Sequence, residues 1–330
     1  MKKILVLLLL AAIVAPAFAD DALVLPKGVL RTTIAPSYAS IGKGFDKDGN
    51  REDLKDLSGG TIDSLSIWTL SGALEYGITD ELNIAAQWGP GWQFGGSVTA
   101  ADGVPEPNKS VIENAKPTGL NDLFIGAKGQ ILGPNGYVPN EMMRFAAAAG
   151  FIVPLSVYDP DDAAKNQAAG DEYQQGRVGN DTFATGFRLY YDYIFSDSFF
   201  WNVYSEFIYS FPRDLDQGGG VDAEVAPGYE LTFETEPDYS TMIGEGLEFG
   251  ASLPITYQIN GESEVEGTGS KDSTTSLSMQ PTVSFFFQSL PVPTQLDLGY
   301  GFTLYGTGDD AAFAPASNVV LLQIKNFLRF

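Results

Sequence analysis

The 330-residue chain contains neither cysteine nor histidine. The absence of cysteine rules out a disulfide framework, so an exported form of this protein has to be stabilised by hydrogen-bonded strands and packing. The absence of both residue types also excludes Ser-His and Asp-His catalysis, and zinc sites built from imidazole or thiolate. No pair stands out among the 42 acidic residues. We therefore expect a protein that is not an enzyme and needs no cofactor.

Basic residues are also scarce, with 19 Lys and Arg against 42 Asp and Glu, which gives a net charge of -23. Such a charge argues against binding to nucleic acid and against polybasic attachment to anionic lipid. Long apolar runs are missing as well. A transmembrane helix needs about 20 apolar residues, and no stretch reaches that length. A helical membrane protein is therefore excluded.

The first 19 residues are typical of a secretory signal peptide. Lys2 and Lys3 precede a short apolar stretch, and an Ala-x-Ala motif ends at Ala19. We expect cleavage before Asp20. No linker or shift in composition divides residues 20–330, so we predict that they form a single domain.

Glycine, tyrosine and phenylalanine are abundant, with 37, 15 and 22 residues. Strands of a membrane barrel need about 9 to 11 residues with apolar side chains at every second position, joined alternately by short turns and long loops. We predict an all-β fold, an antiparallel transmembrane β-barrel of about 12 strands with short periplasmic turns and long external loops. The predicted strands are 29–41, 65–78, 82–94, 121–132, 142–153, 183–195, 199–211, 229–236, 247–257, 276–288, 295–305 and 320–330.

The eighth of these strands is the least regular, and we expect it to end in a turn at Pro237-Asp238. A soluble β-sandwich or a secreted β-solenoid also alternates apolar and polar residues. The sequence disfavours both. It has no repeat of fixed period, and its aromatic residues lie near both ends of the outward faces.

The chain ends inside a predicted strand whose last residue is Phe330. A terminal strand with an aromatic final residue resembles the closing strand of outer-membrane barrels in Gram-negative-type bacteria, where the insertion machinery reads that segment. The resemblance implies a location in the outer membrane of a diderm bacterium. It also implies that outer-membrane lipid and the barrel-insertion machinery are partners.

If the apolar faces contact lipid, the opposite faces line the lumen. The candidate lumen-lining residues are Asp122, Lys128, Arg144, Arg188, Asp192 and Glu206. An unpaired charge in a partly desolvated lumen carries a large desolvation cost. We therefore expect Arg144, Arg188, Asp192 and Glu206 to form one ion-pair network that braces adjacent strands, and a role in contacting solute is the alternative. The aromatic residues interleaved with these charges favour a partly apolar solute over a hydrated ion.

The third predicted strand contains Trp88-Gly89-Pro90-Gly91-Trp92. Proline donates no backbone hydrogen bond and glycine adds no packing, so we expect this segment to interrupt the ladder. The gap could form a side window toward lipid, with Trp88, Pro90 and Trp92 as its candidate residues. The alternative is that the segment lies at the outer rim, where strand pairing ends.

The loop that follows the first strand contains the only local likeness to a calcium-binding loop that we identify. Asp46, Asp48 and Asn50 have the spacing of alternate calcium ligands. However, the glycine lies too early in the loop, and Leu57 occupies the position of the bidentate Glu. A solvated turn is therefore the preferred interpretation.

Three stretches, 25–28, 74–82 and 119–128, resemble the outer-membrane proteins of the phenol-degradation MetA-pathway family, which is related in architecture to the fatty-acid and toluene channels. The resemblance implies passive uptake of small, partly hydrophobic solutes. A narrow general porin and a closed structural or surface barrel are the alternatives. Fatty-acid channels carry an amino-terminal hatch that plugs the lumen. Here the segment between Asp20 and the first strand is short, and we expect no such plug.

Overall fold

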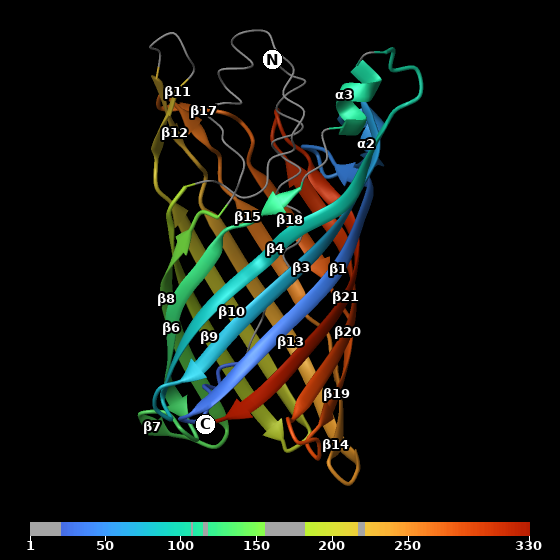
Figure 1. The fold of residues 1–330 in the computed structure, drawn as a ribbon. Helices are drawn as coiled ribbons and strands as arrows, with labels where there is room; N and C mark the ends of the chain where they lie inside the picture. Colours follow the sequence, from blue (N-terminus) through green and yellow to red (C-terminus); the bar gives the residue numbers. More distant parts are fainter. Residues whose placement is uncertain (1–20, 107, 115–117, 156–181, 217–221) are drawn as a thin grey trace.

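The computed structural model describes residues 21–106, 108–114, 118–155, 182–216 and 222–330, so the predicted signal peptide lies outside the described residues. Twelve antiparallel strands close into a barrel (Figure 1), which confirms the predicted fold class. In order around the wall the strands are β1 (Val29–Phe45), β3 (Ile62–Gly77), β4 (Leu82–Ala100), β6 (Leu123–Gly133), β8 (Met143–Val153), β9 (Ala184–Ser196), β10 (Phe199–Ser210), β13 (Glu230–Gly244), β14 (Leu247–Ser252) with β15 (Ile255–Asn260), β18 (Thr274–Met279) with β19 (Thr282–Phe287), β20 (Thr294–Gly308) and β21 (Ala314–Arg329).

The barrel closes between its first and last strands. β1 and β21 pair along their whole length, from Val29 opposite Arg329 to Phe45 opposite Ala314. Beyond the last pair, the N–H of Phe330 donates to the carbonyl of Gly28 at 2.9 Å. Gly28 has a φ of 78°, a conformation that favours glycine, and it turns the chain into β1. No edge strand is left unpaired at this seam.

Side chains alternate between the two faces of the wall, as the period of a β-strand requires. The outer face is apolar and exposed, whereas many polar side chains are buried on the inner face. The exposed outward residues include Ile34, Trp68, Leu74, Ile84, Ile125, Phe151, Phe187, Trp201, Phe207, Phe233, Tyr257, Leu298 and Val320. This pattern is that of a barrel surrounded by lipid.

The predicted turn at Pro237-Asp238 is wrong. β13 runs through Pro237, which lies opposite Trp201, and ends at Gly244. Proline lacks one donor, but its carbonyl still accepts the N–H of Leu253 at 3.2 Å, so the pairing continues. The chain reverses instead at Glu245-Gly246, where Gly246 has a φ of 73°.

Two strands predicted as continuous are each interrupted by a proline. Pro254 follows β14 and precedes β15, and Pro281 separates β18 from β19. The backbone bonds around these prolines continue from strand to strand, because Gln280 N donates to Pro254 O at 2.9 Å and Tyr300 N donates to Pro281 O at 3.1 Å. Pro237, Pro254 and Pro281 thus form a line across neighbouring strands in the wall.

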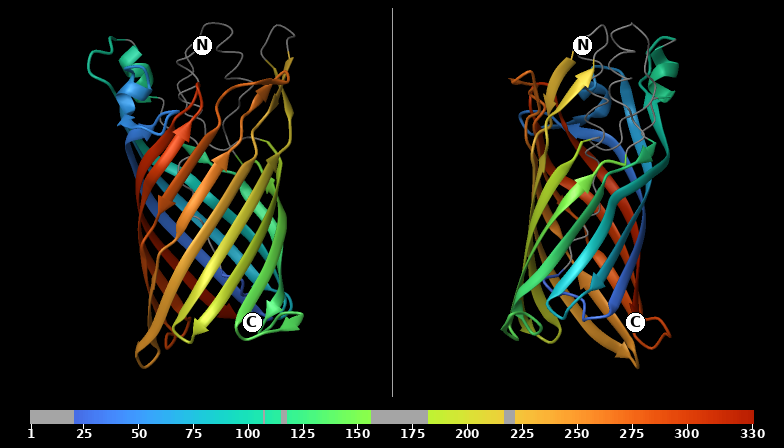
Figure 2. Two further views of the ribbon diagram at one scale, coloured as in Figure 1. Left: turned by 180° about the vertical axis from the view of Figure 1, so that it is seen from behind. Right: turned by 60° about the vertical axis from the view of Figure 1, so that its left-hand side comes forward.

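The long connections at one end of the barrel are more structured than predicted (Figure 2). The short turns lie at the opposite end, together with the carboxy terminus. A second sheet, formed from two predicted loops, consists of β11 (Arg213–Asp216), β12 (Asp222–Ala226), β16 (Glu264–Val265) and β17 (Thr268–Gly269). The smaller elements are β2 (Arg51–Asp53), α2 (Leu54–Leu57), α3 (Asn108–Asn114), β5 (Gly119–Leu120) and β7 (Val138–Pro139). Over the described ranges, no helix is long and apolar enough to cross a membrane.

Candidate functional site

Residues 21–25 lie inside the barrel, so the expectation of no plug is wrong, and we call segment 21–27 the plug. The N–H of Ala22 donates to both carboxylate oxygens of Asp192, at 3.1 Å each. Lys128 Nζ donates to the carbonyl of Asp21 at 2.5 Å, and Asn83 Oδ1 accepts the N–H of Leu25 at 3.0 Å. A short segment suffices as a plug because inward side chains of β4, β6 and β9 reach it.

Apolar contacts seat the same segment. Ala22 is fully buried, and it packs in one cluster with Ala146, Ala148, Tyr190 and Tyr204. The small alanines of β8 leave room for a backbone inside the barrel. The segment therefore occupies the lumen between the wall formed by β8 and the rings of β9 and β10.

Asp192 is the centre of the polar contacts at the plug. It is 0% exposed, and it also accepts from Asn202 Nδ2 at 3.1 Å and from Arg144 Nη1 at 3.5 Å. Lys128 Nζ additionally lies 4.3 Å from the centroid of the Tyr190 ring, within the range of a cation–π contact. The buried carboxylate is thus compensated by donors from three directions.

A second set of polar residues crosses the lumen over the inner faces of β6 and β8. Glu206 on β10 accepts from Arg188 Nε at 2.5 Å, and Arg188 also donates to Gln87 on β4. Gln87 Nε2 donates to Glu75 at 3.4 Å, and Glu75 pairs with Arg31 at 2.6 Å. We name these five residues the transluminal chain. β9 and β4 are not neighbours in the wall, so the Arg188–Gln87 contact spans the interior.

The four charged residues predicted to form one network are divided between these two groups. Arg144 pairs with Asp192 at the plug, whereas Arg188 pairs with Glu206 in the transluminal chain. Both pairs join residues directly opposite each other on adjacent strands, as expected for bracing contacts. Sequence reasoning missed Gln87 and Asn83. Asn83 and Gln87 share one face of β4, which indicates inward side chains. They were missed because neutral amides are less conspicuous in the sequence than charged residues.

Asp122 is the candidate lumen residue for which the structure gives the least detail of contacts. It precedes β6 and has the same parity as Phe124 and Lys128. The Phe124 ring is buried and lies 3.9 Å below the Arg188 guanidinium, measured to the ring centroid. Phe124 therefore adds an aromatic surface beneath the transluminal chain.

The segment Trp88–Trp92 forms a bulge rather than a break in β4. Gly72 lies opposite Trp88 and Leu70 opposite Trp92, so the three residues 89–91 face a single residue of β3. On the other side, the ladder to β6 stops at Gln87 and resumes with β5 at Trp92. The expectation that the ladder is interrupted holds only on that second side.

Asn121 bridges the gap beside the bulge. Its N–H and its Nδ2 donate to the carbonyl of Gly91 at 2.8 and 3.0 Å, and its own carbonyl accepts from Trp88 Nε1 at 2.9 Å. Trp92 is 43% exposed on the outer face, and Pro90 is half-buried. At the position predicted for the window, hydrogen bonds thus join Asn121 to Trp88 and Gly91.

The loop with spacing like that of calcium ligands forms a compact turn. Asp46 Oδ1 accepts the N–H groups of Asp48 and Asn50 at 2.9 and 2.7 Å, and Asn50 Nδ2 donates to Asp46 Oδ2 at 3.1 Å. These bonds, with the Asn50 side-chain contact as the largest cause, lower the pKa of Asp46. Among the described residues, no three acidic side chains are placed to hold a metal ion. The solvated turn is the arrangement that the structure contains.

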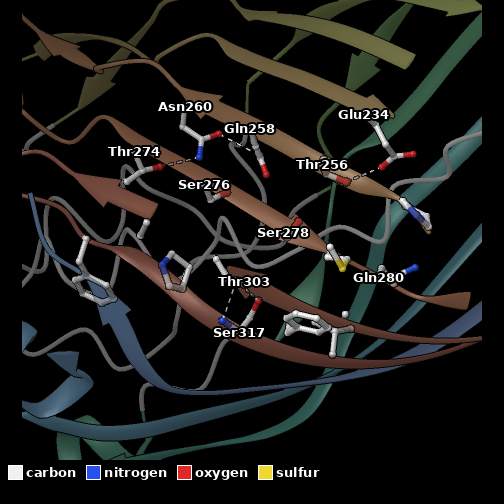
Figure 3. A pocket seen from close by; sticks show the side chains of 18 residues that line it. Glu234, Thr256, Gln258, Asn260, Thr274, Ser276, Ser278, Gln280, Thr303 and Ser317 are labelled. Carbon is white, nitrogen blue, oxygen red and sulfur yellow. Dashed lines mark hydrogen bonds between the residues drawn. The ribbon is translucent and has the colours of Figure 1, made fainter. Parts of the chain in front are cut away.

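A cavity that is partly open to solvent lies against the inner faces of β13, β15, β18, β20 and β21. Figure 3 shows its hydroxyl and amide side chains converging from several strands. They form local pairs, such as Asn260 Nδ2 with Thr274 Oγ1 at 2.8 Å and Thr256 Oγ1 with Glu234 Oε2 at 2.6 Å. Phe313 and Val319 add apolar surface to the lining. The cavity wall is therefore amphipathic.

No protein-family model matches this chain, and no curated protein matches it. Among solved structures, an outer-membrane channel from Pseudomonas putida F1 is similar over 96% of this chain and 100% of its own, with 16% identity and a TM-score of 0.63. A FadL homologue of Pseudomonas aeruginosa matches with 13% identity and a TM-score of 0.38, covering 92% of this chain and 90% of its own. The toluene transporter TodX of Pseudomonas putida has 8% identity and a TM-score of 0.35, covering 93% and 91%.

The chain shares its fold with the channel from Pseudomonas putida F1, which confirms the predicted resemblance at the level of the fold.

Proposed function

We propose that this protein is an outer-membrane channel through which small, partly hydrophobic solutes diffuse without an energy source. The observation that carries this proposal is the amphipathic cavity inside a closed barrel. A hydrophilic pore would be lined by charged and polar groups throughout, whereas this cavity combines hydrogen-bonding groups with Phe313 and Val319. Such a lining suits solutes with an apolar body and a small polar group.

An apolar lining at the end of the barrel with the long connections supports the same function. A buried apolar cluster covers the inner faces of β1, β3, β4 and β21, and α2 contributes Leu54 to it. Its members are Ala39, Ile41, Leu54, Ile62, Leu65, Ile67, Val98, Phe313 and Val319. Because Phe313 and Val319 also line the cavity, the apolar cluster and the cavity are continuous.

We also propose where the protein is located in the cell. An apolar outer face, a closed wall and the predicted signal peptide together favour export to the outer membrane of a diderm bacterium, with insertion guided by the terminal strand. The end with the short turns and Phe330 is then periplasmic, and the plug lies in the path from the cavity to the periplasm.

A closed structural barrel is the second candidate, because the plug and the transluminal chain both occupy the lumen. Planar-bilayer recordings separate the two candidates, since a closed barrel gives no conductance. Swelling of proteoliposomes in sugars tests for a narrow general porin. Facilitated uptake of aromatic solutes together with exclusion of sugars supports the channel proposed here.

A further inference from the structure

Three carboxylates follow one another on the inner face of β13. Glu234, Glu236 and Asp238 occupy alternate positions, and Glu234 is only 3% exposed. Alternate residues of a strand share a face, so these side chains form one line along the lumen wall. We call them the acidic stripe.

The strands on both sides of the acidic stripe present neutral side chains to it. Tyr204 and Thr256 lie opposite Glu234, and Asn202 lies opposite Glu236. Phe200 and Ser252 lie opposite Asp238. No cross-strand partner of the stripe carries a positive charge.

Three other inward carboxylates are paired with cations. Glu75 pairs with Arg31 at 2.6 Å, Glu206 with Arg188 at 2.5 Å and Asp297 with Lys325 at 3.2 Å. Within the described ranges of the chain, no Lys or Arg nitrogen lies within 4.0 Å of a stripe carboxylate. The stripe is thus a line of carboxyl groups that the neighbouring strands do not pair with cations.

Glu234 gives an independent indication of a ligand. Its Oε2 accepts from Thr256 Oγ1 at 2.6 Å, but its buried Oε1 has no hydrogen-bond partner among the described residues. The side chain lines the cavity (Figure 3). A buried carboxylate oxygen without a donor is costly, and a donor arriving through the cavity would remove that cost.

We propose that the acidic stripe binds the ammonium group of small organic cations whose apolar body lies against the cavity wall. This inference rests on the proposed function, and it names the solute class. Tyr204 lies opposite Glu234, and Phe313 and Val319 line the same cavity, so an aromatic or alkyl body finds apolar partners beside the carboxyl groups. Among the residues that the structure describes, no group of three or more possible metal ligands is found, so the stripe does not form a metal site of that kind.

The test is isothermal titration calorimetry of the full barrel in detergent with benzylammonium, benzyl alcohol and benzoate at neutral pH. We expect benzylammonium to bind more tightly than the other two. We expect Glu234→Gln to weaken benzylammonium binding about tenfold, the effect of losing one charge-assisted contact. Asp63→Asn, at an exposed position of β3, makes the same change in net charge and should leave binding unchanged.

Heat-modifiable migration on gels checks that each variant is folded, and Asp238→Asn provides a second variant of the stripe. Equal affinities for benzylammonium and benzyl alcohol would overturn the inference, as would unchanged benzylammonium binding in both stripe variants. Because the titration needs no transport, failure of the inference is distinguishable from failure of the channel. A barrel that transports neutral aromatic solutes but does not prefer benzylammonium keeps the proposed function and loses the inference.

Discussion

Ala22 and Asp192 are 170 positions apart in the sequence, and the N–H of Ala22 donates to both carboxylate oxygens of Asp192 at 3.1 Å. This contact anchors the plug to β9. Replacing one buried acceptor leaves the donor unsatisfied at a cost of about 1–3 kcal/mol. We expect Asp192→Ala to release the segment and raise single-channel conductance in planar bilayers.

Asp192→Asn is the control, because its amide oxygen still accepts one hydrogen bond at nearly the same volume. We expect it to lie between the wild type and the alanine variant. Conductance of Asp192→Ala equal to that of the wild type would show that segment 21–27 does not limit the path.

Gly77 provides a second way to disturb the plug without changing charge. A Cβ on Gly77 would lie 2.3 Å from Pro26 O and 2.6 Å from Leu25 O, so alanine cannot fit unless the plug moves. A Cβ on Gly72, in the same strand, would meet Thr33 O at an ordinary 3.5 Å. We expect Gly77→Ala to increase protease cleavage within residues 21–27, whereas Gly72→Ala does not. Equal cleavage of the two variants would contradict this arrangement.

The transluminal chain should contribute to stability. Arg188→Gln leaves Glu206 without its cation, and breaking a buried ion pair in this way costs about 3–5 kcal/mol. We expect a lower midpoint of urea unfolding, followed by tryptophan fluorescence. The double variant Arg188→Gln/Glu206→Gln removes both charges and should recover part of the loss. A double variant less stable than the single one would show that the charges act separately.

The contact of Asp310 with two lysines in the long connections should depend on pH. Asp310 accepts from Lys47 at 3.1 Å and from Lys271 at 3.3 Å, and these partners, Lys47 foremost, lower the pKa of Asp310. A carboxyl group with a lowered folded pKa stabilises the contact above its ordinary value of 3.8, and the contribution is lost as the pH falls through the folded value. We expect spin labels on the loops that carry Lys47 and Asp310 to keep their separation at neutral pH and to move apart under acid. A separation independent of pH, or unaffected by Asp310→Asn, would contradict this.

The barrel could be predicted from the sequence because its determinants are local. Alternation in β9 and β10 predicted a hairpin that the structure contains, with Phe207 opposite Phe187. The turn at Pro237 was predicted wrongly because the sequence alone does not distinguish a proline in a turn from a proline in a strand. In such a strand, the residues beside the proline keep their backbone hydrogen bonds. The two were distinguishable only by the pairing of Pro237 with Trp201.

The contents of the lumen could be predicted only in part. Charge and parity placed Arg188 and Glu206 together, because opposite charges on adjacent strands pair directly. The plug could not be predicted, since the contacts of Ala22 and Leu25 depend on side chains from β4 and β9. The contact between Arg188 and Gln87 likewise requires the curvature of the closed barrel.

The central claim is that this barrel is a channel for small, partly hydrophobic solutes. Its most direct test is the initial rate of uptake of a labelled aromatic solute by diderm cells that express the protein, compared with cells that do not. We predict a severalfold faster rate in the expressing cells, with no swelling of proteoliposomes in sugars. Identical uptake rates in the two cell populations, with the barrel shown to be folded in the outer membrane, would contradict the claim.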